Sequence, residues 1–538
     1  MGTAVASVGE WLTTTDHKRI GRLYLGAGAV GFLLAAVLAV LVGAERIATG
    51  GKLVDADALT QLFALERFGF TYLALAPLVL GAALAVVPLQ LGARSLAFPR
   101  LAAAGFWLWL IGAVLAVYSI IGNGGPNGGN ARFVELFILA TMLVLAGLLA
   151  GAVCLTTSIL TTRAPGMNMR RLPMFSWSVL VACLAALISL PVVAGDLLFT
   201  YVANRFQAAQ NLLSGSQAIG EWAGFGFSQP TTLLFIIPVF GFFAETVATA
   251  SGMRQPSRGV LFTGIGLIGL VSLATVVQSP ITLRPAFLDL GLGDLLADLL
   301  PFGLVHGLPL LGALLAFALI VKPLSARPRN VRKQVMAPVA FGLLAALLAL
   351  LAVAASAAAH IGDAALLGTT FEEGNWLAVG FAGVLAAMGA VTYWAPKWWG
   401  RSLSNATLPL ALLAFLGAGL AALPLMVAGF ADQPGAVFAA VGSDADAIVN
   451  FDYGGPASLW NTLSTIGLAL ATLSVLGFIV VAARSVATGQ QVADDPWNGQ
   501  TLEWVAESPA AADNFAVVHT VASAEPALDL RVSDRGAR

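Results

Sequence analysis

Residues 11–44 read WLTTTDHKRIGRLYLGAGAVGFLLAAVLAVLVGA, a short polar lead followed by an apolar run with no charged residue after Arg22. The apolar part begins at Ile20 and is longer than the roughly 20 residues that a helix needs to cross a hydrocarbon core about 30 Å thick. A cleavable signal peptide has a shorter apolar core, so none is expected here. The stretch therefore predicts a membrane-spanning helix close to the N-terminus.

The same pattern recurs along the chain. Eleven further apolar stretches lie at about 68–91, 101–122, 132–161, 173–203, 228–251, 258–280, 295–321, 334–358, 375–396, 405–429 and 459–484. Hydrophobic residues make up 58% of the chain and charged residues 10%, whereas about a quarter of a soluble domain is charged. The sequence predicts an all-α integral membrane protein with one twelve-helix membrane domain over residues 1–484 and a cytoplasmic C-terminal tail over residues 485–538.

The basic residues predict the orientation in the bilayer. Most of the 27 lysine and arginine residues, such as Lys18, Arg171 and Lys397, fall in segments that share one side of the membrane with the N-terminus. Positively charged loops stay in the cytoplasm, so both termini are expected there, in a bacterial plasma membrane. The net charge is −1 and no basic cluster is present, which gives no indication of nucleic-acid binding.

Short motifs fill the turns and helix ends, where hydropathy alone does not dictate the residues. In chain order they are Trp11–Gly21, Val87–Arg94, Ala97–Arg100, Arg163–Met167, Pro173–Trp177, Pro238–Gly241 with Glu245, Tyr393–Lys397, Trp460–Gly467, Asp494–Trp497, Thr501–Trp504 and Ser508–Pro509. Their order and the number of spans resemble subunit I of cytochrome c oxidase, of the haem–copper oxidase superfamily, over most of the 538 residues. The resemblance implies a twelve-helix bundle with haem a, haem a3 and copper, neighbouring subunits II and III, and electron transfer from cytochrome c to oxygen.

The histidines do not match that resemblance, because the family uses more histidine ligands than the four histidines of this chain. His17 and His519 lie in polar terminal segments and His360 lies between two spans, which leaves only His306 inside a predicted helix. His306 is either a neutral imidazole bonded to a neighbouring carbonyl or a functional residue.

Alignment through the neighbouring motifs shows what replaces the ligands that the resemblance implies. The substituted positions are Glu66 for the low-spin haem histidine, Gln229 for a copper histidine, Leu233 for the cross-linked tyrosine, Thr275 and Val276 for the histidine pair of the seventh helix, and Asn375 and Leu377 for those of the tenth. Haem iron takes His, Met, Cys or Tyr as its axial ligand, and copper of this kind takes imidazoles. We therefore expect no haem, no copper, no metal site and no catalytic residue.

The remaining polar residues suggest one structural contact. Arg67 lies at the outer end of the second span, and Glu372 and Glu373 lie at the outer end of the tenth. Charged groups at membrane depth need partners, so Arg67 is predicted to pair with one of these carboxylates and cover the space where the family holds its low-spin haem. Separate solvated charges are the alternative. Phe371, Trp376 and Leu377 are expected to fill part of that space.

Three functions remain open at this point. The first is a non-catalytic scaffold or partner subunit of a respiratory membrane complex, in contact with the lipid bilayer and with subunit-II-like and subunit-III-like proteins. The second is a channel or transporter that uses the emptied haem cavity. The third is a terminal oxidase subunit with unorthodox ligation. Enzymatic activity is not expected in the first two.

Overall fold

The computed structural model describes most of the chain. The described residues are 9–47, 54, 56–126, 128–206, 231–277, 281–284, 291–326, 335–362, 366–435, 455–517 and 519–536. Within them, twelve helices are long and apolar enough to cross a membrane. Each coincides with one of the twelve predicted spans, which confirms the all-α membrane fold.

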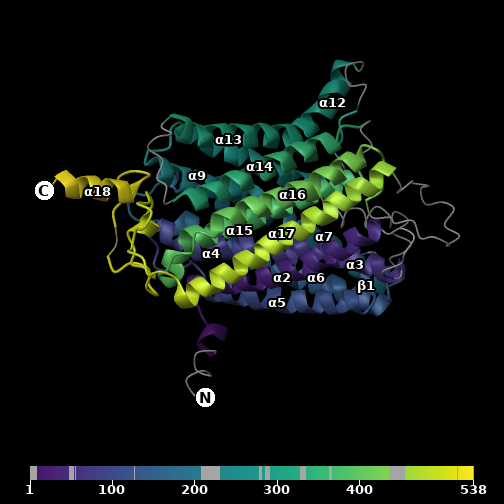
Figure 1. Ribbon diagram of the computed structural model, residues 1–538, viewed down its shortest axis with the longest axis horizontal. Helices are drawn as coiled ribbons and strands as arrows, with labels where there is room; N and C mark the ends of the chain where they lie inside the picture. Colours follow the sequence, from purple (N-terminus) through teal and green to yellow (C-terminus); the bar gives the residue numbers. More distant parts are fainter. Residues whose placement is uncertain are drawn as a thin grey trace.

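The spans are built from one or more helical segments each. They are α2 (His17–Ile47), α3 (Ala56–Phe68) with η1 (Gly69–Leu75) and α4 (Ala76–Leu91), α5 (Pro99–Ile121), α6 (Ala131–Thr161), α7 (Met174–Arg205), η4 (Thr231–Ile236) with α9 (Ile237–Ser251), α10 (Arg258–Ile268) with η5 (Gly269–Ser272) and α11 (Leu273–Val277), α12 (Leu292–Phe302) with η7 (Gly303–Gly307) and α13 (Leu308–Ala326), α14 (Met336–Ala359), α15 (Thr370–Trp399), α16 (Thr407–Gly429) and α17 (Gly455–Thr488). Smaller elements are the antiparallel strands β1 (Gly124–Gly125) and β2 (Gly128–Gly129), the short helices η2 (Met169–Arg171) and η10 (Leu502–Trp504), and α18 (Pro526–Gly536). Figure 1 shows the spans side by side, with the C-terminal tail at one end and β1 at the other.

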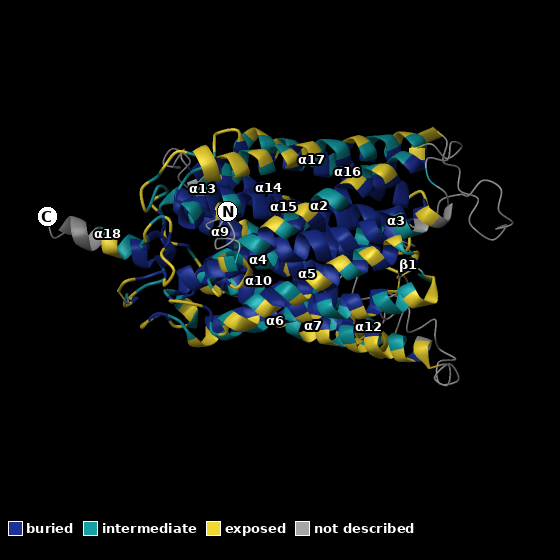
Figure 2. Ribbon diagram, turned by 90° about the horizontal axis from the view of Figure 1, so that it is seen from below, coloured by how far each residue is buried: buried dark blue, intermediate teal, exposed yellow. Residues whose placement is uncertain are grey.

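The bundle has an inner and an outer layer of helices. Within the most apolar 18-residue stretch of each span, all residues are buried in the span of η4 and α9 and 94% in those of α3–α4 and α15, whereas only 33% are buried in α17. The outer helices expose apolar side chains such as Val30, Leu416 and Leu473. Figure 2 shows exposed stretches on the outer helices around a buried middle. An apolar outer surface is what lipid contact requires, because hydrocarbon offers no partner for polar groups.

Small residues let two of the outer helices approach closely. An added Cβ at Gly417 would lie 2.5 Å from the backbone nitrogen of Ala471, and one at Gly467 would lie 2.3 Å from that of Ala421. These distances leave no space for a side chain. Close backbone approach through small residues is a common way to join membrane helices, and here it joins α16 to α17.

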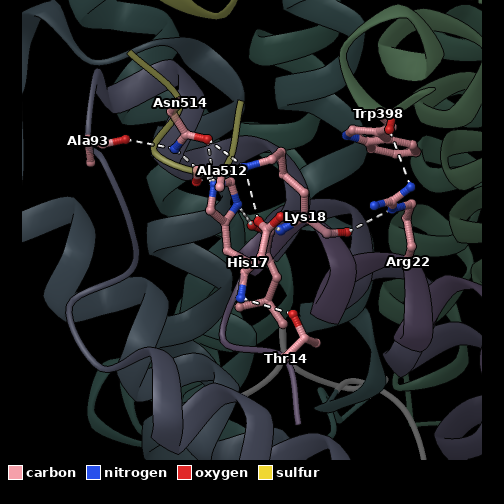
Figure 3. A network of polar contacts seen from close by, with 10 residues as sticks. Thr14, His17, Lys18, Arg22, Ala93, Trp398, Ala512 and Asn514 are labelled. Carbon is pink, nitrogen blue, oxygen red and sulfur yellow. Dashed lines mark hydrogen bonds and ion pairs between the residues drawn. The ribbon is translucent and has the colours of Figure 1, made fainter. Parts of the chain in front are cut away.

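The tail after α17 folds back over the end of the bundle and contacts the beginning of α2 (Figure 3). His17 Nδ1 donates to the carbonyl of Leu84 (2.9 Å), so its Nε2 accepts from the amide nitrogen of Asn514 (2.9 Å). The same amide donates to the Ala93 carbonyl (2.8 Å), and its oxygen accepts from Lys18 Nζ (2.8 Å). His17 is therefore only 1% exposed, although the sequence placed it in a polar terminal segment.

A second buried contact fixes the tail at η10. The carboxylate of Glu503 accepts from Gln90 Nε2 (3.1 Å) and from the indole nitrogen of Trp394 (3.3 Å). Burial raises the pKa of the Glu503 carboxyl, while these hydrogen bonds oppose the shift. Gln90 in turn accepts from the Ser176 hydroxyl (2.7 Å). The tail is thus bonded to three spans, α4, α7 and α15, through one polar chain.

Candidate functional site

A buried ion pair lies at the end of the bundle opposite the tail. Arg46, in the last turn of α2, donates through Nη1 to Oε1 of Glu373 (2.7 Å) and through Nη2 to Oε2 of the same carboxylate. Its Nη2 also donates to the carbonyl of Gly435 (2.7 Å). Arg46 is 3% exposed and Glu373 4%. Two parallel hydrogen bonds match the planar guanidinium to the carboxylate and fix its orientation.

Arg46 takes the place that the sequence assigned to Arg67. Among the residues that the structure describes, Arg67 forms no ion pair within 4 Å, and its guanidinium lies over the rings of Phe63 (5.0 Å) and Trp376 (5.7 Å). Glu372 accepts from the backbone amide of Gly368 (2.7 Å) at the start of α15. The predicted pair of Arg67 with Glu372 or Glu373 is therefore wrong, because the end of α2 brings a second arginine closer to Glu373.

Glu66 lies in the same buried region. It is 2% exposed and interacts electrostatically with Glu373, Arg46 and Arg67. Its Oε2 has no hydrogen-bond partner within the described segments. The position at which the resemblance implies a haem-ligating histidine therefore holds a buried carboxyl group beside two arginines.

Aromatic side chains fill the space between η1 and α15. The indole nitrogen of Trp376 donates to the Thr71 hydroxyl (2.9 Å), and its ring centroid lies 4.9 Å from that of Phe70. Phe70 also packs on Phe381 (5.4 Å) and lies so close to Gly380 that an added Cβ would be 1.7 Å from its ring. The packing agrees with the prediction that Trp376 fills this space. Phe70 was not predicted, since nothing in its local sequence distinguishes it from an ordinary core residue.

The positions implied for the copper side lie elsewhere in the core. The hydroxyls of Thr231 and Thr275 are 2.9 Å apart, and Leu233 beside them in η4 is 1% exposed. Val276, in contrast, is 54% exposed on the outside of the bundle, so only one of the two neighbouring positions 275 and 276 faces inward. Gln229 lies outside the described residues.

The two positions on α15 have different surroundings. The Asn375 side chain, with its amide turned so that both groups are satisfied, donates to the Ala352 carbonyl (3.0 Å) and accepts from the Ser356 amide (3.1 Å). It therefore bonds α15 to α14. Leu377 is 1% exposed and packs in the main core.

Two of the four histidines lie together, which the sequence did not predict. The ring centroids of His306 and His360 are 4.3 Å apart, and both residues are 2% exposed. His306 Nε2 donates to the Ile281 carbonyl (3.2 Å), in agreement with a neutral imidazole bonded to a neighbouring carbonyl. His360 Nδ1 donates to the Ser356 carbonyl (2.7 Å), and burial lowers its pKa. The contact depends on α13 and α14 lying side by side, and no local pattern signals that.

Comparison with known proteins agrees with this architecture. The twelve-span bundle is of the haem–copper oxidase subunit I type, and a family model for cytochrome c and quinol oxidase polypeptide I matches residues 19–470. The chain therefore belongs to that family.

Individual relatives match almost the whole chain. A putative cytochrome c oxidase subunit 1-beta of Streptomyces avermitilis is 27% identical over 97% of this chain and 92% of its own length. Cytochrome c oxidase subunit 1 of Bacillus subtilis is 26% identical over 96% of this chain and 82% of its own. A haem–copper oxidase subunit I+III of Aeropyrum pernix is 27% identical over 96% of this chain and 62% of its own.

Family membership corrects the expectation about cofactors. The sequence predicted that no cofactor binds, but the matching family and these relatives are haem–copper oxidase subunits, whose cofactors are haem and copper. The predicted absence of cofactors is therefore wrong, since the comparison points to their presence in the family.

The side chains at the aligned positions nevertheless lack the imidazole nitrogens that would bind haem iron and copper. Glu66, Leu233 and Thr275 supply no imidazole, and Trp376 with Phe70 fills the neighbouring space. Across the described ranges, no three His, Cys, Asp or Glu side chains lie close enough to hold one metal ion. No reaction step through haem or copper can therefore be assigned to these residues.

Proposed function

We propose that this chain is a subunit-I-type component of a respiratory membrane complex that serves in assembly and does not itself reduce oxygen. The observation that supports the proposal most directly is the chemistry of two buried side chains at the positions implied for the copper side. Leu233 is 1% exposed, and Thr275 is 2% exposed with its hydroxyl bonded to that of Thr231. Hydroxyl and aliphatic groups there have no capacity to replace imidazoles as copper ligands. The loss of the family's ligands at these positions is part of the proposal.

The partners follow from the same family. We expect subunit-II-like and subunit-III-like proteins to contact the outer helices, in a bacterial plasma membrane with both termini in the cytoplasm. The Aeropyrum pernix relative is named as subunit I+III, which supports a subunit-III-like neighbour for this chain. The basic residues beside the termini support the orientation.

The experiment is purification of the complex through this chain, followed by subunit identification and oxygen uptake with reduced cytochrome c. We expect co-purification of the two partner types and no oxygen uptake above that of a preparation from cells lacking the chain. Thr275→Ala and its neighbour Val276→Ala form a matched pair, because only Thr275 faces the core. Uptake that falls tenfold in Thr275→Ala and not in Val276→Ala would contradict the proposal and indicate an oxidase with unorthodox ligation. Ion flux in reconstituted vesicles would instead favour a channel.

A further inference from the structure

An apolar cavity lies between α2, α15 and α17, toward the end of the bundle that carries the tail. Its volume is about 390 Å³, within the range of roughly 300–1,000 Å³ typical of ligand pockets. Phe32, Leu78, Met388 and Phe478 are among the apolar side chains that line it. Such a space accepts a hydrocarbon chain and offers a water-soluble ligand little to bind.

The cavity opens toward the lipid-facing surface of the bundle. Gly26 on α2 and Val486 on α17 form part of its lining, and both are exposed on the outside of the helices. A molecule already in the bilayer can therefore enter sideways between α2 and α17. Four residues near the tail line the same cavity: Trp11, Arg22, Trp398 and Trp399.

Arg22 supplies a positive charge at this end. Its Nε donates to the carbonyl of Lys18 and its Nη1 to that of Trp398, each at 3.3 Å (Figure 3). The guanidinium also lies 4.9 Å from the Trp11 ring centroid. Within the described part of the chain, no carboxylate lies within 4 Å of its nitrogens, since Asp16 pairs with Lys18 (3.0 Å). Asp16 interacts with the Arg22 guanidinium only over a longer distance, so Arg22 can still accept an anion as a direct hydrogen-bond partner.

Trp398 supplies a second, unused donor. The residue is 3% exposed and lines the cavity, and its indole nitrogen has no hydrogen-bond partner among the described residues. A buried N–H group without an acceptor costs free energy. An oxygen acceptor placed at this end of the cavity would remove that cost.

We propose that the cavity binds an anionic phospholipid from the leaflet on the side of the tail. One acyl chain lies among Phe32, Leu78 and Phe478, and the phosphate oxygens accept hydrogen bonds from Arg22 and from the indole N–H of Trp398. The combination of an apolar chain and an acceptor-rich anion fits both halves of the site. A basic residue at the bilayer surface attracts anionic lipid headgroups in the same way.

Native mass spectrometry of the full chain in mild detergent, titrated with phosphatidylglycerol or phosphatidylcholine, tests the proposal. We expect the chain to retain phosphatidylglycerol preferentially and Arg22→Gln to weaken that binding about fivefold, since one basic residue near the surface contributes about that factor. Arg19→Gln is the matched control, because Arg19 carries the same charge and lies one turn before Arg22. Arg19 already pairs with Glu10 (3.4 Å). Equal binding by the two variants, or equal binding of the two lipids, would overturn the proposal.

Two further variants keep the test decisive if Arg22→Gln does not fold. Trp398→Phe retains the ring and removes the donor, and we expect binding to weaken about threefold or more, as for a lost hydrogen bond. Ala482→Phe fills the cavity from α17 and leaves every charge in place. We expect it to abolish retention of the lipid. If both variants bound phosphatidylglycerol as the unsubstituted chain does, the lipid would contact the outer surface of the bundle without entering the cavity. That result would refute the proposed site.

Discussion

Replacing Asn514 with glycine is expected to release the tail from the first span. Asn514 is 3% exposed and has a φ of +61°, which glycine adopts without strain, so the substitution removes the side chain and preserves the turn. The lost contacts are the hydrogen bonds to His17, to the Ala93 carbonyl and from Lys18. Neutral bonds contribute about 0.5–1.5 kcal/mol each and a charged one about 1.5–3 kcal/mol.

Lys18 moderates the loss, because its Nζ still contacts Asp16 (3.0 Å) and donates to the Ala512 carbonyl (3.2 Å). The free energy that holds the tail in place should therefore fall by about 3 kcal/mol. That change corresponds to an increase of about a hundredfold in the fraction of molecules with a detached tail.

Hydrogen exchange measures that fraction at two amides of the tail. Ala510 donates to the Lys397 carbonyl (3.0 Å) and Val521 to the Pro165 carbonyl (2.8 Å), so both are protected only while the tail is in place. We expect their protection to fall about a hundredfold in Asn514→Gly. Asp432→Gly is the control, since Asp432 is exposed and has a φ of +59° at a position outside the tail. Unchanged protection in Asn514→Gly, or the same loss in the control, would refute the reasoning.

Three other substitutions test the remaining buried contacts. Burial raises the pKa of Glu503, so its protonated form favours the docked tail and docking should weaken as the pH rises through that pKa. In Glu503→Gln the hydrogen exchange of the tail should lose this pH dependence. A pH dependence that persists in Glu503→Gln would show that another group causes it. Glu373→Ala leaves Arg46 buried without its carboxylate and should cost about 3–5 kcal/mol, seen as a lower unfolding temperature. A loss below about 1 kcal/mol would show that water reaches the arginine. Trp376→Ala should cost about 3–5 kcal/mol in the same assay, whereas Leu416→Ala on the lipid-facing surface should have little effect; equal losses would argue against a packed interior at Trp376.

The spans could be predicted from the sequence because hydropathy determines them directly. A run of apolar residues the length of a bilayer has few alternatives to a membrane helix, and each predicted run is a helix in the structure. The ends were less predictable. The last span extends to Thr488, one turn beyond 484, because a helix continues into the interface wherever its polar residues find water or a neighbouring segment.

The contacts within the candidate site depended on distances that no local pattern contains. Arg46 and Arg67 are both basic residues at the same end of the bundle, and the sequence does not tell which of them reaches Glu373; in the structure it is Arg46, while Arg67 lies over Trp376. Likewise, His306 and His360 are separated by two helices in the sequence, α13 and α14, and touch because these helices pack beside each other. An alignment can suggest which residues stand at the positions of the family's ligands, but it cannot give the contacts that these residues make.

The contact between His17 and Asn514 has a consequence for how the protein is made. These residues are 497 positions apart, and at a synthesis rate of about 5–20 residues per second they appear roughly 25–100 s apart. Throughout that interval the start of the first helix lacks the partner that later buries it. A ribosome that stops before the last turns of the chain therefore leaves a bundle with all its spans but with His17 and Lys18 uncovered. Such an unfinished product exposes polar groups that the tail otherwise covers, and a protease or chaperone can recognise it there.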